Sequence, residues 1–144
     1  MSKSFRLLAA AALTALAASA HADFVTSSQG VNFTFHTVDS DTFTLRIQNA
    51  DNATGNWAPA DYLSFLGFDA ITGAQQTVTG AQVTVNPAQN PVTSWSFTAA
   101  QLTGQGCGNA GNSGAICLDA NPNVLLSSDL LFTVNLLGLS LIHI

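Results

Sequence analysis

Apolar and polar residues alternate with a period of two along residues 31–36 and again along residues 42–48. This spacing is typical of a β-strand that buries one face. Asp39-Ser40-Asp41 lies between the two runs and has the composition of a turn. Two alternating runs with a short polar link predict an antiparallel hairpin. Its inward residues are expected to be Phe33, Phe35, Phe43, Leu45 and Ile47, and its outward residues Thr34, His36, Thr44 and Arg46.

Further short runs have a similar character. Residues 63–68 are apolar and predict a buried strand. Three later runs contain the Val, Thr, Phe and Leu residues that suit strands: residues 76–86, 92–98 and 130–136. Residues 57–63 allow at most one helical turn, because the stretch is too short for a stable helix. About seven short strands separated by turn residues indicate a sandwich or barrel. The sequence therefore predicts an all-β fold, an antiparallel β-sandwich of jelly-roll or immunoglobulin-like type.

The start of the chain has the features of a secretory leader outside the mature fold. Lys3 and Arg6 form a basic beginning, and residues 7–18 are almost unbroken Leu and Ala. Ala20-His21-Ala22 supplies the small-x-small pattern that signal peptidase cuts. The apolar run is shorter than the roughly 20 residues of a membrane-spanning helix. The sequence thus predicts a signal peptide over residues 1–22, with cleavage between Ala22 and Asp23.

The last six residues, 139–144, have a different character. Leu-Ser-Leu-Ile-His-Ile resembles a frame translation of the mosaic-end adaptor used in transposase-based sequencing libraries. We therefore expect the natural protein to continue past Gly138 with other residues, and the β ectodomain to occupy residues 23–138. A genuine strand end is the alternative, because the hexapeptide also alternates. On the adaptor interpretation His143 has no functional meaning.

Charge narrows the range of partners. The chain has 3 basic and 8 acidic residues, and every acidic residue is Asp. Lys3 and Arg6 lie in the leader, so the processed chain keeps Arg46 against eight carboxylates, a formal charge of −7. Such a chain lacks the basic surface that binds phosphate backbones, so we expect no nucleic-acid partner. An apolar content of 47% argues against disorder.

Cys107 and Cys117 are the only cysteines, and both lie in the exported part. In an oxidising compartment an isolated pair predicts a structural disulfide. Closing a loop of this length stabilises a fold by about 3 kcal/mol in the chain-entropy model. A metal site would need further ligands, and a redox pair is usually spaced C-x-x-C.

Nothing in the sequence indicates catalysis. His36 is the only histidine left when the leader and residues 139–144 are set aside, and it occupies an outward strand position. Glu is absent, while Asp39 and Asp41 flank a turn where Asp commonly bonds the local backbone. No nucleophile-elbow, zinc-protease or phosphate-loop motif occurs. We expect neither enzyme activity nor a cofactor.

Several loops offer oxygen atoms that could bind calcium. Calcium requires 6–8 oxygens, usually from a loop of fixed spacing, which is absent here. We therefore predict no metal site. The oxygen-bearing residues of these loops are Asp39, Asp41, Asn49, Asp51, Asn52, Asp119 and Asn121.

Aromatic residues are the remaining candidates for ligand binding. Trp57 lies in a loop, and Tyr62 follows it closely, so these two could act as stacking platforms for sugars. Trp95 alternates with Phe97 in a predicted strand, which favours core packing instead.

One resemblance extends over most of the mature chain. It rests on AHADF at residues 20–24, DTFTLRIQN at 41–49, ATGNWAPA at 53–60, LFTV at 131–134, Trp95, Cys107 and Cys117. Together these stretches resemble the ectodomains of PEP-CTERM proteins, which exosortases sort. Members have a signal peptide, a Thr/Gly/Asn-rich β ectodomain, and a C-terminal Pro-Glu-Pro motif with a hydrophobic helix and a basic tail. This chain has no Glu, so that tail would lie beyond Gly138.

The resemblance implies signal peptidase and exosortase-type sorting machinery as partners, a transient inner-membrane anchor, and association with exopolysaccharide. It implies no catalytic residue. We therefore expect a non-catalytic protein of the cell surface or extracellular matrix. The alternative is a small secreted carbohydrate-binding module that uses Trp57 or Tyr62.

Overall fold

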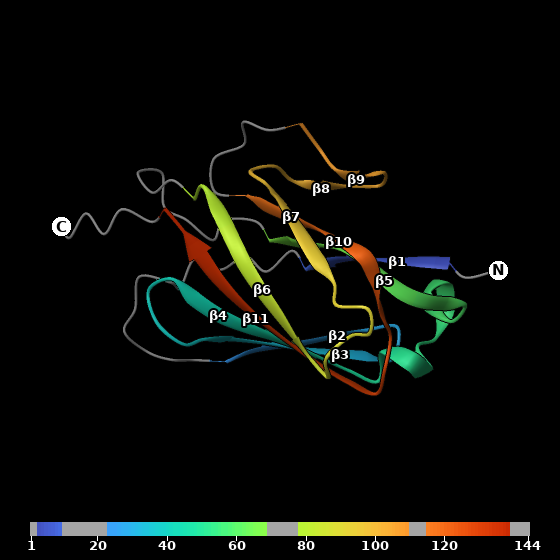
Figure 1. Ribbon diagram of the computed structural model, residues 1–144. Helices are drawn as coiled ribbons and strands as arrows, with labels where there is room; N and C mark the ends of the chain where they lie inside the picture. Colours follow the sequence, from blue (N-terminus) through green and yellow to red (C-terminus); the bar gives the residue numbers. More distant parts are fainter. Residues whose placement is uncertain (1–2, 10–22, 69–77, 110–114, 139–144) are drawn as a thin grey trace.

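The computed structural model describes residues 3–9, 23–68, 78–109 and 115–138, with side chains from Asp23 onward. Within these ranges the protein is all β, with eleven strands and two short 3₁₀ turns. Two sheets pack face to face, and a small hairpin lies beside one of them (Figure 1). The predicted antiparallel β-sandwich is confirmed.

The first sheet has five strands, all antiparallel. Its order is β2 (Phe24–Ser28), β3 (Val31–Thr37), β4 (Thr42–Gln48), β11 (Asp129–Leu137) and β6 (Gly80–Asn86). The strands β3 and β4 form the predicted hairpin. All five residues predicted to face inward are buried, because alternation places them on the face that meets the second sheet.

The second sheet has four strands. Its order is β1 (Lys3–Ala9), β5 (Ala60–Phe68), β10 (Ile116–Leu125) and β7 (Ser94–Thr98). The strands β5, β10 and β7 are antiparallel, whereas β1 pairs with β5 in parallel. The 3₁₀ turns, Ala50–Asn52 and Gly55–Trp57, connect the end of β4 to β5.

The core between the sheets is apolar and rich in Phe. Phe68 from β5 contacts two rings of the opposite sheet: its centroid lies 4.9 Å from that of Phe43 and 6.4 Å from that of Phe35. Phe35 and Phe43 stack on each other at 4.8 Å. Trp95 packs edge-on against Phe132 at 5.9 Å, as its alternation with Phe97 predicted. Aromatic burial on both sheets therefore joins the two layers.

The strand β1 is a difference from the sequence-based expectation. The sequence predicts residues 3–9 to lie in a leader outside the mature fold, whereas in the structure they pair with β5 along Ala60–Phe68. This pairing does not test whether signal peptidase cuts the chain, so the signal peptide stays a prediction. Its site residues Ala20 and Ala22 lie outside the described residues, as do residues 139–144.

Besides β1, the pattern of residues does not predict β2, the short strands β8 (Leu102–Thr103) and β9 (Gly106–Cys107), or β10. The strand β2 is exposed along its whole length and does not alternate, so periodicity gives no signal there. The strand β10 contains Asn121-Pro122, which reads as a turn. Its pairing with β5 jumps from Asp119–Phe65 to Val124–Leu63, so the strand continues through an irregularity that a sequence pattern cannot show.

Candidate functional site

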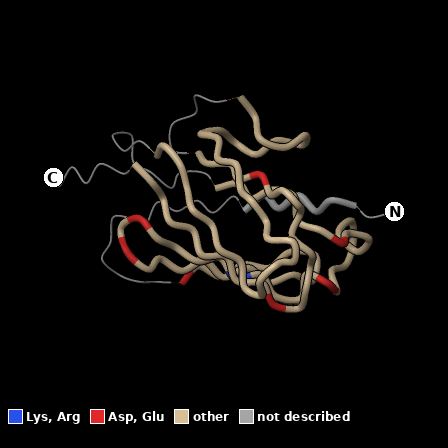
Figure 2. Tube along the Cα trace, in the orientation of Figure 1, with Lys and Arg blue, Asp and Glu red and all other residues tan. Residues whose placement is uncertain are grey.

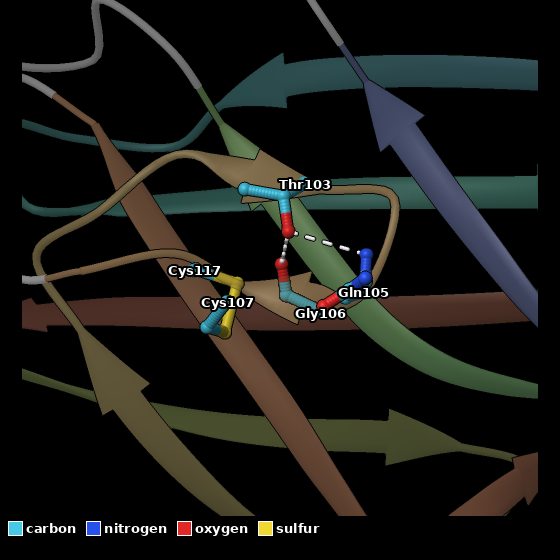
Figure 3. The surroundings of a disulfide bond; sticks show 5 residues. All are labelled: Thr103, Gln105, Gly106, Cys107 and Cys117. Atoms are coloured by element: carbon cyan, nitrogen blue, oxygen red, sulfur yellow. Dashed lines mark hydrogen bonds between the residues drawn. A yellow bond between two sulfur atoms is a disulfide. The ribbon is translucent and has the colours of Figure 1, made fainter.

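The predicted disulfide between Cys107 and Cys117 is present, with an S–S distance of 2.06 Å. Cys107 ends a small hairpin made of β8 (Leu102–Thr103) and β9 (Gly106–Cys107), and Cys117 lies near the start of β10. The bond thus fastens the hairpin to the second sheet (Figure 3).

Side-chain and backbone hydrogen bonds shape the tip of this hairpin. The Thr103 hydroxyl donates to the Gly106 carbonyl at 2.9 Å and accepts from the Gln105 amide at 3.2 Å (Figure 3). Gly106 has a φ of 115°, a conformation that side-chain-bearing residues rarely adopt. The hairpin on the surface of the second sheet is therefore held by its own hydrogen bonds as well as by the disulfide.

The hairpin packs closely on β5. A Cβ atom built at Gly67 would lie 2.5 Å from the Cβ of Leu102, and one at Gly106 would lie 2.8 Å from the Phe65 ring. Both glycines permit an approach that any larger residue would block. The outer side of β5 is thus covered here, while Leu63 and Leu66 are fully buried in the core.

The outward side of the first sheet is polar. Arg46 on β4 contacts Asp129 on β11 through two hydrogen bonds, Nε to Oδ1 at 2.9 Å and Nη2 to Oδ2 at 2.5 Å. This bonding lowers the pKa of the Asp129 carboxyl and raises the pKa of Arg46. The partner of Arg46 could not be found from sequence, because the two residues are 83 positions apart and meet only when β4 pairs with β11.

His36 contacts an acidic side chain on the same sheet. Its Nδ1 contacts an Asp23 carboxylate oxygen, and both side chains are about half exposed. The outward position predicted for His36 is confirmed. Asp23, the residue expected to begin the processed chain, is thereby attached to β3. The pair lies on an open sheet surface.

Trp57 occupies the second 3₁₀ turn and is half-buried. Its ring packs edge-on against Phe33, with centroids 6.0 Å apart, and its backbone amide donates to the Gln29 side-chain oxygen at 3.1 Å. The indole thus supports the end of the core, which leaves only part of its surface for a ligand.

Tyr62 lies on β5 with its side chain directed away from the core, since the next residue, Leu63, is fully buried. Its cross-strand partner on β10 is Leu125, which is 55% exposed. Tyr62 and Leu125 therefore form an aromatic and aliphatic pair on the outer side of the second sheet.

The turn residues Asp39 and Asp41 serve local structure. Asp39 Oδ1 accepts from the backbone amides of Asp41 at 3.1 Å and Thr42 at 2.8 Å, as predicted for a turn. The acidic residues within the described ranges are spread over several turns and strands (Figure 2). Among the described residues no three His, Cys, Asp or Glu side chains lie close enough together to hold a metal ion.

Comparison with known proteins adds no relative. No family model, curated protein or solved structure matches the chain. Within the described residues, no helix has the length and apolar character needed to cross a membrane.

Proposed function

We propose that this chain is a non-catalytic exported protein of the cell surface or extracellular matrix, associated with exopolysaccharide and sorted by an exosortase through a C-terminal tail. The carrying observation is the Cys107–Cys117 disulfide, which fastens a surface hairpin to a charge-poor sandwich. Such bonds persist in oxidising compartments outside the cytoplasm. The leader pattern at residues 1–22 supports the same location.

Export is tested by expressing the full chain with its own leader in a Gram-negative host. We expect the periplasmic product to begin at Asp23, by mass spectrometry, and to contain no free thiol. A variant with Ala20→Arg and Ala22→Arg lacks the small-x-small pattern that signal peptidase cuts, and it should stay uncleaved. A chain that keeps residues 1–22, or that carries two free thiols after purification from the periplasm, would contradict export.

Exosortase sorting is tested at the gene. Reading the natural gene past Gly138 should show Pro-Glu-Pro, a hydrophobic segment and a basic tail. A stop codon there without these features removes the sorting part of the proposal and leaves export unaffected.

A small carbohydrate-binding module is the second candidate, favoured by the outward Tyr62 beside exposed Leu125. A pull-down with insoluble polysaccharides tests it. Tyr62→Ala should abolish retention, because stacking on aromatic faces contributes much of sugar affinity. The effect of Trp57→Ala would be harder to interpret, because the Trp57 ring also packs against Phe33 in the core. Equal retention of Tyr62→Ala and the parent chain would reject this candidate.

A further inference from the structure

Asp23 and His36 lie opposite each other at one end of the pairing between β2 and β3. The register pairs Phe24 with Phe35, and its continuation by one residue places Asp23 across from His36. The Asp23 carboxylate contacts Nδ1 of the His36 imidazole. The side chains of Asp23 and His36 are 52% and 42% exposed, so ions in solution can reach both. An oxygen donor and a nitrogen donor therefore meet on an open face of the first sheet.

The predicted cleavage before Asp23 adds a third donor at the same place. It converts the Asp23 backbone nitrogen from an amide, which is a poor metal ligand, into a free α-amino group. This amine and the side-chain carboxylate belong to one residue, so together they can close a chelate ring on a metal ion. The imidazole of His36 lies against that carboxylate. Three donors, two of them from the new first residue, are then within reach of one ion.

This donor set suits Cu²⁺ better than the other common divalent ions. Mixed nitrogen and oxygen ligands in a tetragonal arrangement favour Cu²⁺ or Ni²⁺, and Cu²⁺ binds more tightly than the other divalent ions of the first transition row. Ca²⁺ and Mg²⁺ instead prefer sites made of oxygen ligands. Metal–ligand bonds of about 2.0–2.2 Å hold neighbouring donors about 3 Å apart. The Asp23 carboxylate and the His36 imidazole are already in contact, so small side-chain rotations suffice.

We propose that removal of the leader creates a Cu²⁺ site on the first sheet, made of the α-amino nitrogen and the carboxylate of Asp23 and Nδ1 of His36. This inference rests on the proposed export. Water fills the remaining coordination positions, because both side chains are about half exposed. Binding releases the proton that a free amine mostly carries at neutral pH. A chain that keeps residues 1–22 lacks this amine, so copper binding depends on processing.

Charge near the site favours a cation. The processed chain has a formal charge of −7, which raises the local concentration of cations. Its one basic side chain is Arg46 on β4, the strand next to β3. The Arg46 guanidinium is bound to Asp129 on β11, on the far side of β4, which weakens its repulsion of an ion at His36. The cross-strand neighbour of His36 on β4 is Thr44, an uncharged residue.

The test uses the chain secreted with its own leader, purified from the periplasm and freed of metal with a chelator. Mass spectrometry establishes the first residue, and isothermal titration with CuSO₄ gives the stoichiometry and the dissociation constant. We expect a chain that begins at Asp23 and binds one equivalent of Cu²⁺, with an electron paramagnetic resonance spectrum split by two nitrogen nuclei. A chain that begins at Asp23 and binds no Cu²⁺ overturns the site and leaves export standing. A chain that keeps residues 1–22 overturns both.

Two histidine variants locate the site. The processed chain contains His36 and His143, and His143 belongs to residues 139–144. Groups that only support a metal ligand contribute about 10–100-fold to affinity, so loss of the ligand itself in His36→Gln should raise the Cu²⁺ dissociation constant at least about tenfold. His143→Gln is the matched control and should leave the constant unchanged. Equal effects of the two variants, or none from His36→Gln, would reject the site. Circular dichroism checks that both variants are folded.

Acetylation tests the amine without any substitution. Lys3 is the only lysine of the chain and leaves with the leader, so the α-amino group of Asp23 is the one amine that remains. Acetic anhydride converts this amine into an amide, and hydroxylamine then removes any ester formed on hydroxyl groups. The singly acetylated chain should lose Cu²⁺ binding, while a mock-treated chain should keep it. Full affinity after acetylation would show that the amine is not a ligand, and the proposal fails.

Discussion

Arg46 is the only basic residue outside the predicted leader, and its guanidinium is held by Asp129 on the neighbouring strand. The contact is a two-point one, in which the planar guanidinium matches the carboxylate geometry. Both side chains are about half exposed, so solvent screens the pair and its contribution to stability is modest.

The pair has a defined pH signature. Hydrogen bonding from Arg46 lowers the pKa of Asp129 below its ordinary 3.8, so the unfolded chain takes up a proton more readily than the folded chain. The stability gained from the pair is therefore present above pH 3.8 and is lost as the pH falls through the folded pKa of Asp129.

Thermal melts from pH 6 to pH 2 test this pair. The melting temperature of Asp129→Asn should fall less steeply with decreasing pH than that of the parent chain. Arg46→Ala should match it, and the double variant should add nothing further; additive effects would show that the two residues act separately.

Gly67 illustrates a second residue-scale constraint, close packing under the hairpin. A Cβ at this position would lie 2.5 Å from Leu102 Cβ, so Gly67→Ala must displace β8. We expect a loss of about 1–3 kcal/mol in the free energy of unfolding by urea denaturation. Gly104→Ala is the matched control, because a Cβ there meets nothing within 4 Å. Equal stability of the two variants would show that the hairpin can move away from Gly67 without loss of stability.

At the scale of elements, the hairpin of β8 and β9 is stabilised more by the Cys107–Cys117 disulfide than by the pairing of its own two strands. Each of the two strands has only two residues, which is too little pairing to stabilise it alone. The Cys107–Cys117 bond, with a sequence separation of 10, restricts the unfolded chain in the same region.

Removal of the disulfide should therefore cost about 3 kcal/mol of unfolding free energy. Urea denaturation of the Cys107→Ser, Cys117→Ser double variant measures it. The parent chain in reductant should give the same loss, since both treatments open the same loop. A double variant as stable as the oxidised parent would mean that the hairpin is held by packing on Phe65 and Gly67.

For the whole molecule, stability depends on the contact between the two sheets. Phe68 crosses from β5 to the stacked pair Phe35 and Phe43. Substitution of a buried Phe by Ala typically costs 3–5 kcal/mol, a large part of the 5–15 kcal/mol that stabilises an ordinary domain.

Phe68→Ala should accordingly lower the free energy of unfolding by about 3–5 kcal/mol in urea. Phe24→Ala is the comparison, because Phe24 is 43% exposed on the edge strand β2 and should lose far less. If both variants lost the same amount, the ring cluster would not be the element that joins the layers.

Local patterns of residues are sufficient to predict the sandwich class, the β3–β4 hairpin with its inward residues, the strand β11 and the disulfide. These follow from period-two alternation and from an isolated cysteine pair, which are local or pairwise signals. Three features depend on the assembled fold: the pairing of Arg46 with Asp129, the packing of Trp57 on Phe33, and the continuation of β10 through Asn121-Pro122. The assembled fold also places residues 3–9 beside β5. Strand order and register bring distant residues together, and no local pattern specifies which edges meet.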